Sequence, residues 1–181
     1  MKKRTFGFII LILILITHIQ SQSGGTDEYT VKASMAARFT TQIDWPQDEN
    51  GDNESEPFVI AVIGKNPFGS KLDSISEKIK IKNRNVQTRY IAKVEEIVEA
   101  GCHLLFISKT SKKKLAEIVE FAGTKPILMI GDTKGYAEMG VHINILIKDG
   151  RLCFEVNRRA IRKSGLNINY HLLKLADRVI Q

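Results

Sequence analysis

Polar and charged residues gather at the ends of the buried strands that the sequence predicts, and they are the residues best suited to bind a small molecule. They follow the predicted first, third and fourth strands, together with one aromatic residue, and comprise Lys65, Asn66, Phe68, Ser108, Lys109, Asp132 and Lys134. In an open parallel sheet the carboxyl ends of the strands meet at one edge, and ligands usually bind in the crevice beyond it. The sequence thus indicates a candidate ligand crevice, although solvated turns and helix caps would have the same composition.

The loop 64–69, Gly-Lys-Asn-Pro-Phe-Gly, stands where a phosphate-binding loop would stand, after the first buried strand and before a helix. A P-loop requires Gly-Lys-Ser/Thr at the helix entrance, and a dinucleotide-binding loop requires three closely spaced glycines. Here Pro67 removes a backbone amide donor and Phe68 adds bulk. We therefore do not expect this backbone to hold a phosphate group or a nucleotide cofactor.

The sequence does not indicate catalytic or metal-binding patterns. The four histidines, His18, His103, His142 and His171, form no HxH or HxxxH pair, and no CxxC spacing occurs. Cys102 abuts His103 on a predicted buried strand, which is not the position of an exposed nucleophile. Adjacent carboxylates occur only in predicted exposed helices and loops. We expect no enzymatic activity, no cofactor and no bound metal.

Cys102 and Cys153 are the only cysteines, and both lie on predicted strands. A disulfide between them and two separate buried thiols fit the sequence equally well. An oxidising compartment would favour the bond. The bond would also require Cα atoms within about 7 Å of each other, and the sequence does not give that distance.

Strand and helix patterns alternate through the middle of the chain. We expect strands over residues 58–63, 85–91, 102–107 and 126–130, each strongly apolar or rich in β-branched residues. Three helices should connect them, the first after Gly69 and the others over 94–100 and 111–122. Such alternation predicts right-handed crossovers and an α/β fold, with a mostly parallel sheet covered by helices on both faces.

Segments at both ends complete the expected fold. Residues 29–43 predict an amphipathic helix with one apolar stripe, formed by Val31, Met35, Phe39 and Ile43. Asp44-Trp45-Pro46 should end that helix, with Trp45 as a hydrophobic plug against the core.

Residues 143–157 predict an antiparallel hairpin that turns at Asp149-Gly150. Two terminal helices are expected after it, over residues 158–165 and 170–180.

The N-terminal segment has the pattern of a secretory signal peptide. Three basic residues precede an apolar run over residues 6–16, and Ser21 and Ser23 predict cleavage before Gly24. The run is shorter than the roughly 20 apolar residues of a membrane-spanning helix, and a retained membrane anchor is the alternative interpretation. Cleavage would leave a single domain over residues 24–181 and would lower the formal charge from +7 to +4. The remaining charge is spread out, so we expect no nucleic-acid partner.

Several motifs, in this order, resemble those of the YfiR-like family of bacterial periplasmic regulators (YfiR/HmsC-like), from about Tyr29 to Ile180. They are Ile-Asp-Trp-Pro at 43–46, the strand and turn at 58–69, Gly-Cys-His-Leu-Leu-Phe-Ile-Ser at 101–108, the Gly-Asp…Gly-Tyr-Ala-Glu-Met-Gly loop at 131–140, and Phe-Glu-Val-Asn at 154–157 before the last helices.

That resemblance implies a non-enzymatic periplasmic protein that binds and represses an inner-membrane sensor protein, a diguanylate cyclase or a histidine kinase. With a cyclase as the partner, it would control cyclic-di-GMP and biofilm formation. The resemblance also implies a homodimer that an outer-membrane OmpA-like partner can withdraw. Arg158, Arg159 and Arg162, expected on the exposed side of a helix, are the candidate partner contact. The alternative function is a small-molecule sensor that uses the strand-end crevice.

Overall fold

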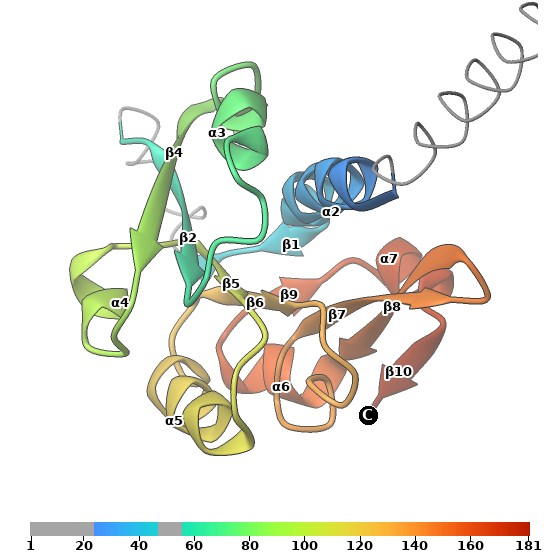
Figure 1. Ribbon diagram of the computed structural model, residues 1–181. Helices are drawn as coiled ribbons and strands as arrows, with labels where there is room; N and C mark the ends of the chain where they lie inside the picture. Colours follow the sequence, from blue (N-terminus) through green and yellow to red (C-terminus); the bar gives the residue numbers. More distant parts are fainter. Residues whose placement is uncertain (1–23, 47–55) are drawn as a thin grey trace, which may run out of the picture.

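An eight-stranded sheet runs through the centre of the protein, in the strand order β10-β8-β7-β6-β5-β2-β4-β3 (Figure 1). The computed structural model describes residues 24–46 and 56–181, and the expected signal peptide lies outside the described residues. Five neighbouring strands at the centre run parallel: β4 (Arg84–Ile91), β2 (Phe58–Ile63), β5 (Leu104–Ile107), β6 (Leu128–Gly131) and β7 (Ile143–Lys148).

The remaining strands pair at the margins of this parallel core. β8 (Arg151–Asn157) is antiparallel to β7 and parallel to β10 (Arg178–Ile180), and β3 (Lys80–Ile81) is antiparallel to β4. A separate antiparallel pair consists of β1 (Ile43–Asp44) and β9 (Asn167–Ile168).

Helices cover both faces of the sheet, which confirms the predicted α/β class (Figure 1). One face carries α2 (Gly24–Thr40), α3 (Lys71–Ser76) and α7 (Tyr170–Leu175), and the other carries α4 (Glu96–Glu99) and α5 (Lys112–Ala122). A further short helix, α6 (Arg158–Lys163), follows β8 directly. No helix within residues 24–46 and 56–181 is long and apolar enough to cross a membrane.

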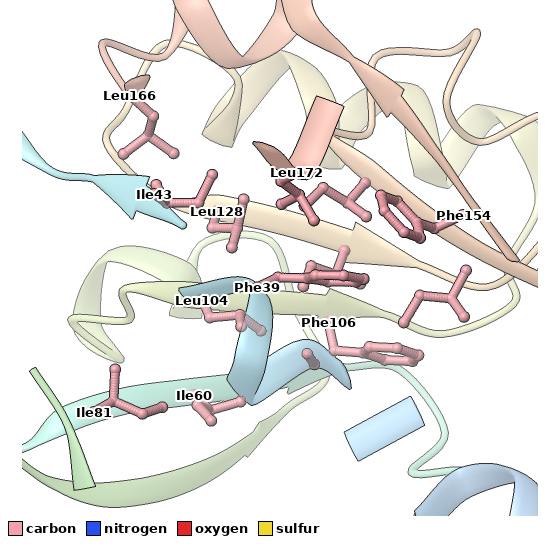
Figure 2. Close-up of a cluster of buried hydrophobic side chains, with 14 of the residues drawn as sticks. Phe39, Ile43, Ile60, Ile81, Leu104, Phe106, Leu128, Phe154, Leu166 and Leu172 are labelled. Atoms are coloured by element: carbon pink, nitrogen blue, oxygen red, sulfur yellow. The ribbon is translucent and has the colours of Figure 1, made fainter. Parts of the chain in front are cut away.

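The β2 strand shows how the sequence produces two cores. All six of its side chains are buried, and they point alternately to the two faces of the sheet, as the pleat requires. Phe58, Ile60 and Val62 join the cluster under α2, while Val59, Ala61 and Ile63 join the cluster under α4 and α5. Figure 2 shows the first cluster, in which Phe39 of α2 and Leu172 of α7 meet side chains from the strands.

The predicted hairpin is present as β7 and β8. Lys148 pairs with Arg151, and the two residues between them, Asp149 and Gly150, have φ angles of 52° and 73°. Two successive positive φ angles are the geometry of a type I′ turn, which matches the twist of antiparallel strands.

The predicted apolar stripe of the first helix is right for Met35 and Phe39, which pack in the core, and wrong for Val31. Val31 is 41% exposed, whereas Lys32 is only 4% exposed. The helix turns Lys32 inward because its ammonium group pairs with Asp132. The helix also ends at Thr40, and Ile43 instead lies in β1, opposite Ile168 of β9.

The predicted final helix over residues 170–180 is also wrong in its second half. α7 ends at Leu175, Ala176 is extended, and residues 178–180 form β10 along the edge of β8. Strand pairing prevails here because β8 offers an otherwise unpaired edge, and because Arg178 forms an ion pair of 2.7 Å with Glu155 on β8.

Candidate functional site

A pocket of about 440 Å³ opens at the carboxyl ends of β2, β5 and β6. Its lining consists of one residue of α2 and six residues of the strand-end loops: Tyr29, Lys65, Asn66, Pro67, Ser108, Lys109 and Asp132. The structure therefore brings together five of the seven residues expected at the strand-end crevice. They meet because the three strands are parallel neighbours, so that the loops that follow them emerge at one edge.

Two of the expected crevice residues lie elsewhere. Phe68 is 1% exposed, and its ring packs edge-on against Phe106 and Tyr29, with centroid distances of 4.7 Å and 5.5 Å. It belongs to the hydrophobic core, because the turn that follows β2 directs it inward. Lys134 is exposed and does not line the pocket.

The carboxylate of Asp132 is held by two residues of α2. Lys32 Nζ donates a hydrogen bond of 2.8 Å to Asp132 Oδ2, and Tyr29 Oη donates one of 3.0 Å to the same oxygen. Lys32 Nζ also lies 2.5 Å from Glu28 Oε1. Burial alone would lower the pKa of Lys32, but its hydrogen bonds to Asp132 and Glu28 outweigh that effect and raise it. Lys32 therefore stays cationic and balances part of the charge of Asp132 and Glu28.

Sequence reasoning did not assign Tyr29 or Lys32 to the site. They are about 100 positions from Asp132 in the chain, and only the packing of α2 brings them near it. One signal was present, because a lysine next to the apolar positions of an amphipathic helix is a candidate for a buried ion pair.

Ser108 has a buried hydroxyl without a partner. The residue is 5% exposed and lines the pocket, and its Oγ makes no hydrogen bond within the described part of the chain. Lys65 and Lys109 flank it at the rim, both exposed, and neither forms an ion pair with any described residue. The pocket thus offers one unused donor and two unused cations.

Tyr136 holds the loop that carries Ser108 and Thr110. Its Oη accepts a hydrogen bond of 2.8 Å from Thr110 N, and donates weakly toward Ser108 O at 3.4 Å. The ring lies against Gly131, where an added Cβ would stand 2.7 Å from Tyr136 Cδ2. The Gly131 and Tyr136 positions of the loop motif are therefore explained by this close approach.

Asn66 shapes its own loop. Its Nδ2 donates to Gly69 O at 2.9 Å, and its Oδ1 accepts from Phe68 N at 2.8 Å. Both ends of the amide are thus occupied within the turn. Asn66 therefore lines the pocket, but its amide group is already used within the loop.

The three candidate partner-contact arginines lie on α6. Arg159 and Arg162 are exposed and Arg158 is half-buried, and none of them forms an ion pair within the described residues. The helix begins at Asn157, whose Oδ1 accepts a hydrogen bond of 2.8 Å from Ala160 N. Its N-terminus is therefore fixed, and the arginines form a cationic surface of defined position.

The two cysteines are free thiols in the structure. Cys102 is buried before β5, and Cys153 lies on β8 opposite Leu146 of β7. Strands β6 and β7 lie between them, and three strand spacings of about 4.8 Å separate them by roughly 14 Å. A disulfide within one chain would need Cα atoms within about 7 Å, so this fold does not allow the bond.

Two histidines have structural roles. His142 is fully buried and its Nδ1 accepts from Met129 N at 3.2 Å, and burial lowers its pKa to about 3. His103 Nδ1 accepts from Val59 N at 3.1 Å, and its ring stacks on Phe58. Among the residues that the structure describes, no three His, Cys, Asp or Glu side chains are grouped as metal ligands.

Trp45 occupies the core, as the plug interpretation predicted. It is 3% exposed and packs edge-on against Phe58, with a centroid distance of 5.6 Å. It thus fastens the segment after α2 to the sheet.

Two solved structures share the fold at low sequence identity. One is described as the ABC domain in complex with L-Trp from Streptococcus pneumoniae, with a TM-score of 0.56 and 10% identity over 82% of this chain. The other is a conserved domain protein from Vibrio cholerae, with a TM-score of 0.51 and 12% identity over 75% of this chain. The aligned region spans 60% of each of those chains. At such identities the likeness shows the fold alone.

Sequence comparison identifies the family. No curated protein shows significant sequence similarity to the chain. The profile of the family described as YfiR/HmsC-like (DUF4154), however, matches residues 29–177, which run from within α2 to the residue before β10. The chain therefore belongs to the YfiR/HmsC-like family, a family of periplasmic regulators.

Proposed function

We propose that this protein is an exported periplasmic regulator that binds and represses an inner-membrane signalling protein, a diguanylate cyclase, and so controls cyclic-di-GMP and biofilm formation. The family match over residues 29–177 carries the proposal. Export would use residues 1–23 as a cleaved signal peptide and leave residues 24–181 as a single domain. The regulator would act as a homodimer and be withdrawn from the cyclase by an OmpA-like outer-membrane protein.

The exposed arginines of α6 are the surface that we assign to partner binding. Arg159 and Arg162 have no counter-charge among the described residues, and the Asn157 cap holds their helix in place. Guanidinium groups bind carboxylates with two parallel hydrogen bonds, which favours an acidic partner surface. The periplasmic region of the cyclase should therefore present Asp or Glu side chains to α6.

A charge reversal on α6 tests this surface. Arg159→Glu/Arg162→Glu should weaken binding of the purified periplasmic region of the cyclase by about tenfold or more, because attraction becomes repulsion. The binding constant is measured by calorimetry, and the melting temperature shows whether the variant folds. In cells, the same variant should raise cyclic-di-GMP as a deletion does.

Lys112→Glu/Lys113→Glu is the matched control, because it makes the same charge change at two exposed positions of α5. It should bind the partner with nearly the wild-type affinity. If both double variants bind like the wild type, α6 is not the contact surface. If the cyclase region does not bind the wild-type protein at all, the proposed function itself is wrong.

A further inference from the structure

We propose that the strand-end pocket binds a small oxyanion, the carboxylate or phosphate group of a soluble metabolite, between the ammonium groups of Lys65 and Lys109 and the hydroxyl of Ser108. The site is separate from the α6 arginines and does not depend on the proposed repression of a cyclase. The proposal rests on the unpartnered hydroxyl in the pocket lining, on the charge of that lining and on the size of the pocket.

The unpartnered hydroxyl of Ser108 is the first observation. Buried hydroxyl groups almost always have a hydrogen-bond partner, because the loss of water otherwise destabilises the fold. Ser108 is 95% buried, lines the pocket and has no partner for Oγ among the described residues. A ligand oxygen in the pocket would accept the hydrogen bond that this hydroxyl can donate.

The charge of the lining is the second observation. Asp132 is the one acidic residue in the lining, and Lys32, 2.8 Å from it, shares its charge between Asp132 and Glu28, so that these three groups together carry one negative charge. Lys65 and Lys109 have no counter-charge among the described residues. The two lysines exceed the single negative charge of the Glu28, Lys32 and Asp132 group, so the net charge at the pocket is positive and attracts an anion.

The same lining argues against other ligand classes. A divalent cation prefers several free carboxylates, whereas the only one here is already paired with Lys32. A backbone phosphate cradle is not formed either, because Pro67 in the loop has no amide hydrogen. Recognition must therefore come from side chains, which suits a single carboxylate or phosphate group on a small molecule.

Another pocket of the protein gives an internal comparison. It lies between α4 and α5, has a volume of about 480 Å³ and contains three acidic residues, Glu95, Glu117 and Glu120. Its size is similar, but with Lys125 as the one cation in the lining its net charge is negative and would repel an oxyanion. The strand-end pocket, at about 440 Å³, is within the range of small-molecule sites and has the opposite free charge.

Titration with two probes tests the proposal. Inorganic phosphate and succinate are each added to the purified full-length mature chain, with binding measured by calorimetry and by the shift in melting temperature. We expect at least one probe to bind with a Kd of about 1 mM or lower, since these probes carry only the anionic part of a metabolite. The probe that binds more tightly shows whether phosphate or carboxylate is the natural group.

Two variants locate the binding. Lys65→Gln/Lys109→Gln should weaken binding by about tenfold or more, because two charge-assisted hydrogen bonds are lost. Ser108→Ala should weaken it about fivefold, and it should not lower the melting temperature of the ligand-free protein, because the buried Oγ has no hydrogen bond to lose. Lys112→Gln/Lys113→Gln removes the same charge from the exposed surface of α5 and should bind as the wild type does.

Three results would overturn the proposal. The first is no binding of either probe up to about 10 mM, well above the Kd that a built site would show. The second is an equal loss of affinity in the Lys112→Gln/Lys113→Gln control, which would mean a diffuse attraction to net charge. The third is unchanged binding in both the Ser108→Ala and the Lys65→Gln/Lys109→Gln variants.

Discussion

At the scale of single residues, Asn157 joins three parts of the molecule. Its backbone ends β8, its Oδ1 caps α6 through Ala160 N, and its Nδ2 donates a hydrogen bond of 2.8 Å to Ala137 O in the loop 132–141. The residue is 2% exposed, so water cannot replace these bonds. The Asn of the Phe-Glu-Val-Asn motif is thus required by geometry.

Asn157→Ala should lower the free energy of unfolding by about 2–4 kcal/mol, because a lost cap costs about 1 kcal/mol and a buried unpaired carbonyl about 1–3 kcal/mol. Urea denaturation measures the change. Asn169→Ala is the control, because Asn169 caps α7 through His171 N but is exposed. It should cost about 1 kcal/mol or less. Equal losses in the two variants would contradict the role of the Ala137 bond.

His142 should make the protein sensitive to acid. Burial lowers its pKa from 6.5 to about 3 in the folded state. Between these values the unfolded chain binds a proton that the folded chain does not, so stability is complete above pH 6.5 and decreases as the pH falls toward 3. Each pH unit in that window removes about 1.4 kcal/mol, which gives a loss of about 2 kcal/mol at pH 5.

His142→Gln tests this pH dependence, because Gln can accept the hydrogen bond from Met129 N but does not titrate. The loss of unfolding free energy from pH 7 to pH 5 should be about 2 kcal/mol smaller in this variant than in the wild type. His171→Gln, at an exposed position, should keep the wild-type pH dependence. If His142→Gln and the wild type lose stability equally, His142 does not cause the effect.

At the scale of elements, α2 is attached to the sheet by packing and by one buried ion pair. Phe39 packs on Phe154 with a centroid distance of 4.9 Å, near one end of the helix. Lys32, at the middle of the helix, and Tyr29, one turn closer to its N-terminus, hold Asp132. The ion pair therefore fixes the rotation of the helix, which explains why Lys32 is turned inward and Val31 outward.

Lys32→Met should lower the free energy of unfolding by about 3 kcal/mol, because it leaves the Asp132 carboxylate buried without its cation. Lys32→Met/Asp132→Asn should recover part of that loss, since Asn carries no charge, and denaturation of the four proteins of the double-mutant cycle measures the coupling. Lys148→Met is the control, because its pair with Asp177 is exposed, at 63% and 40%. It should cost less than about 1 kcal/mol. Similar costs for Lys32→Met and Lys148→Met would show that burial of the pair is unimportant.

The elements that could be predicted from the sequence are those with strong local signals. The apolar run of β2, the Ser111 cap of α5 and the Asp149-Gly150 turn depend on neighbours in the chain. The pairing of β1 with β9 joins two-residue strands more than 120 positions apart, and no local pattern specifies it. β10 was missed because its residues continue a helical apolar pattern, while the open edge of β8 is a property of the assembled sheet.

The residues of the candidate site also fall into those that the sequence could place and those that depend on tertiary packing. Lys65, Ser108 and Asp132 could be placed together because parallel strands end at one edge. The contribution of Tyr29 and Lys32 could not be predicted, since it depends on where α2 docks. The missing partner of Ser108 Oγ is likewise visible only when every neighbour in the structure is known.

At the scale of the whole molecule, the loop 132–141 connects the strand-end pocket with the arginines of α6. It begins at Asp132 in the pocket lining, and Tyr136 within it supports the loop that carries Ser108 and Thr110. Ala137 O then accepts the hydrogen bond from Asn157, the residue that starts α6. A change in the order of this loop can therefore reach both surfaces.

This connection predicts that an oxyanion in the pocket strengthens partner binding. An occupied pocket should order the loop 132–141 and α6 in advance. These segments would then lose less conformational entropy when the partner binds. Saturating phosphate or succinate should tighten binding of the cyclase periplasmic region by about fivefold, and reciprocity requires the partner to tighten oxyanion binding by the same factor. Calorimetry in both orders of addition measures the two factors.

Ser108→Ala should bind the partner as the wild type does but respond less to the oxyanion, because its pocket is emptier at the same concentration. Wild-type protein that binds the oxyanion, and then binds the partner with unchanged affinity, would show that the loop does not couple the two surfaces.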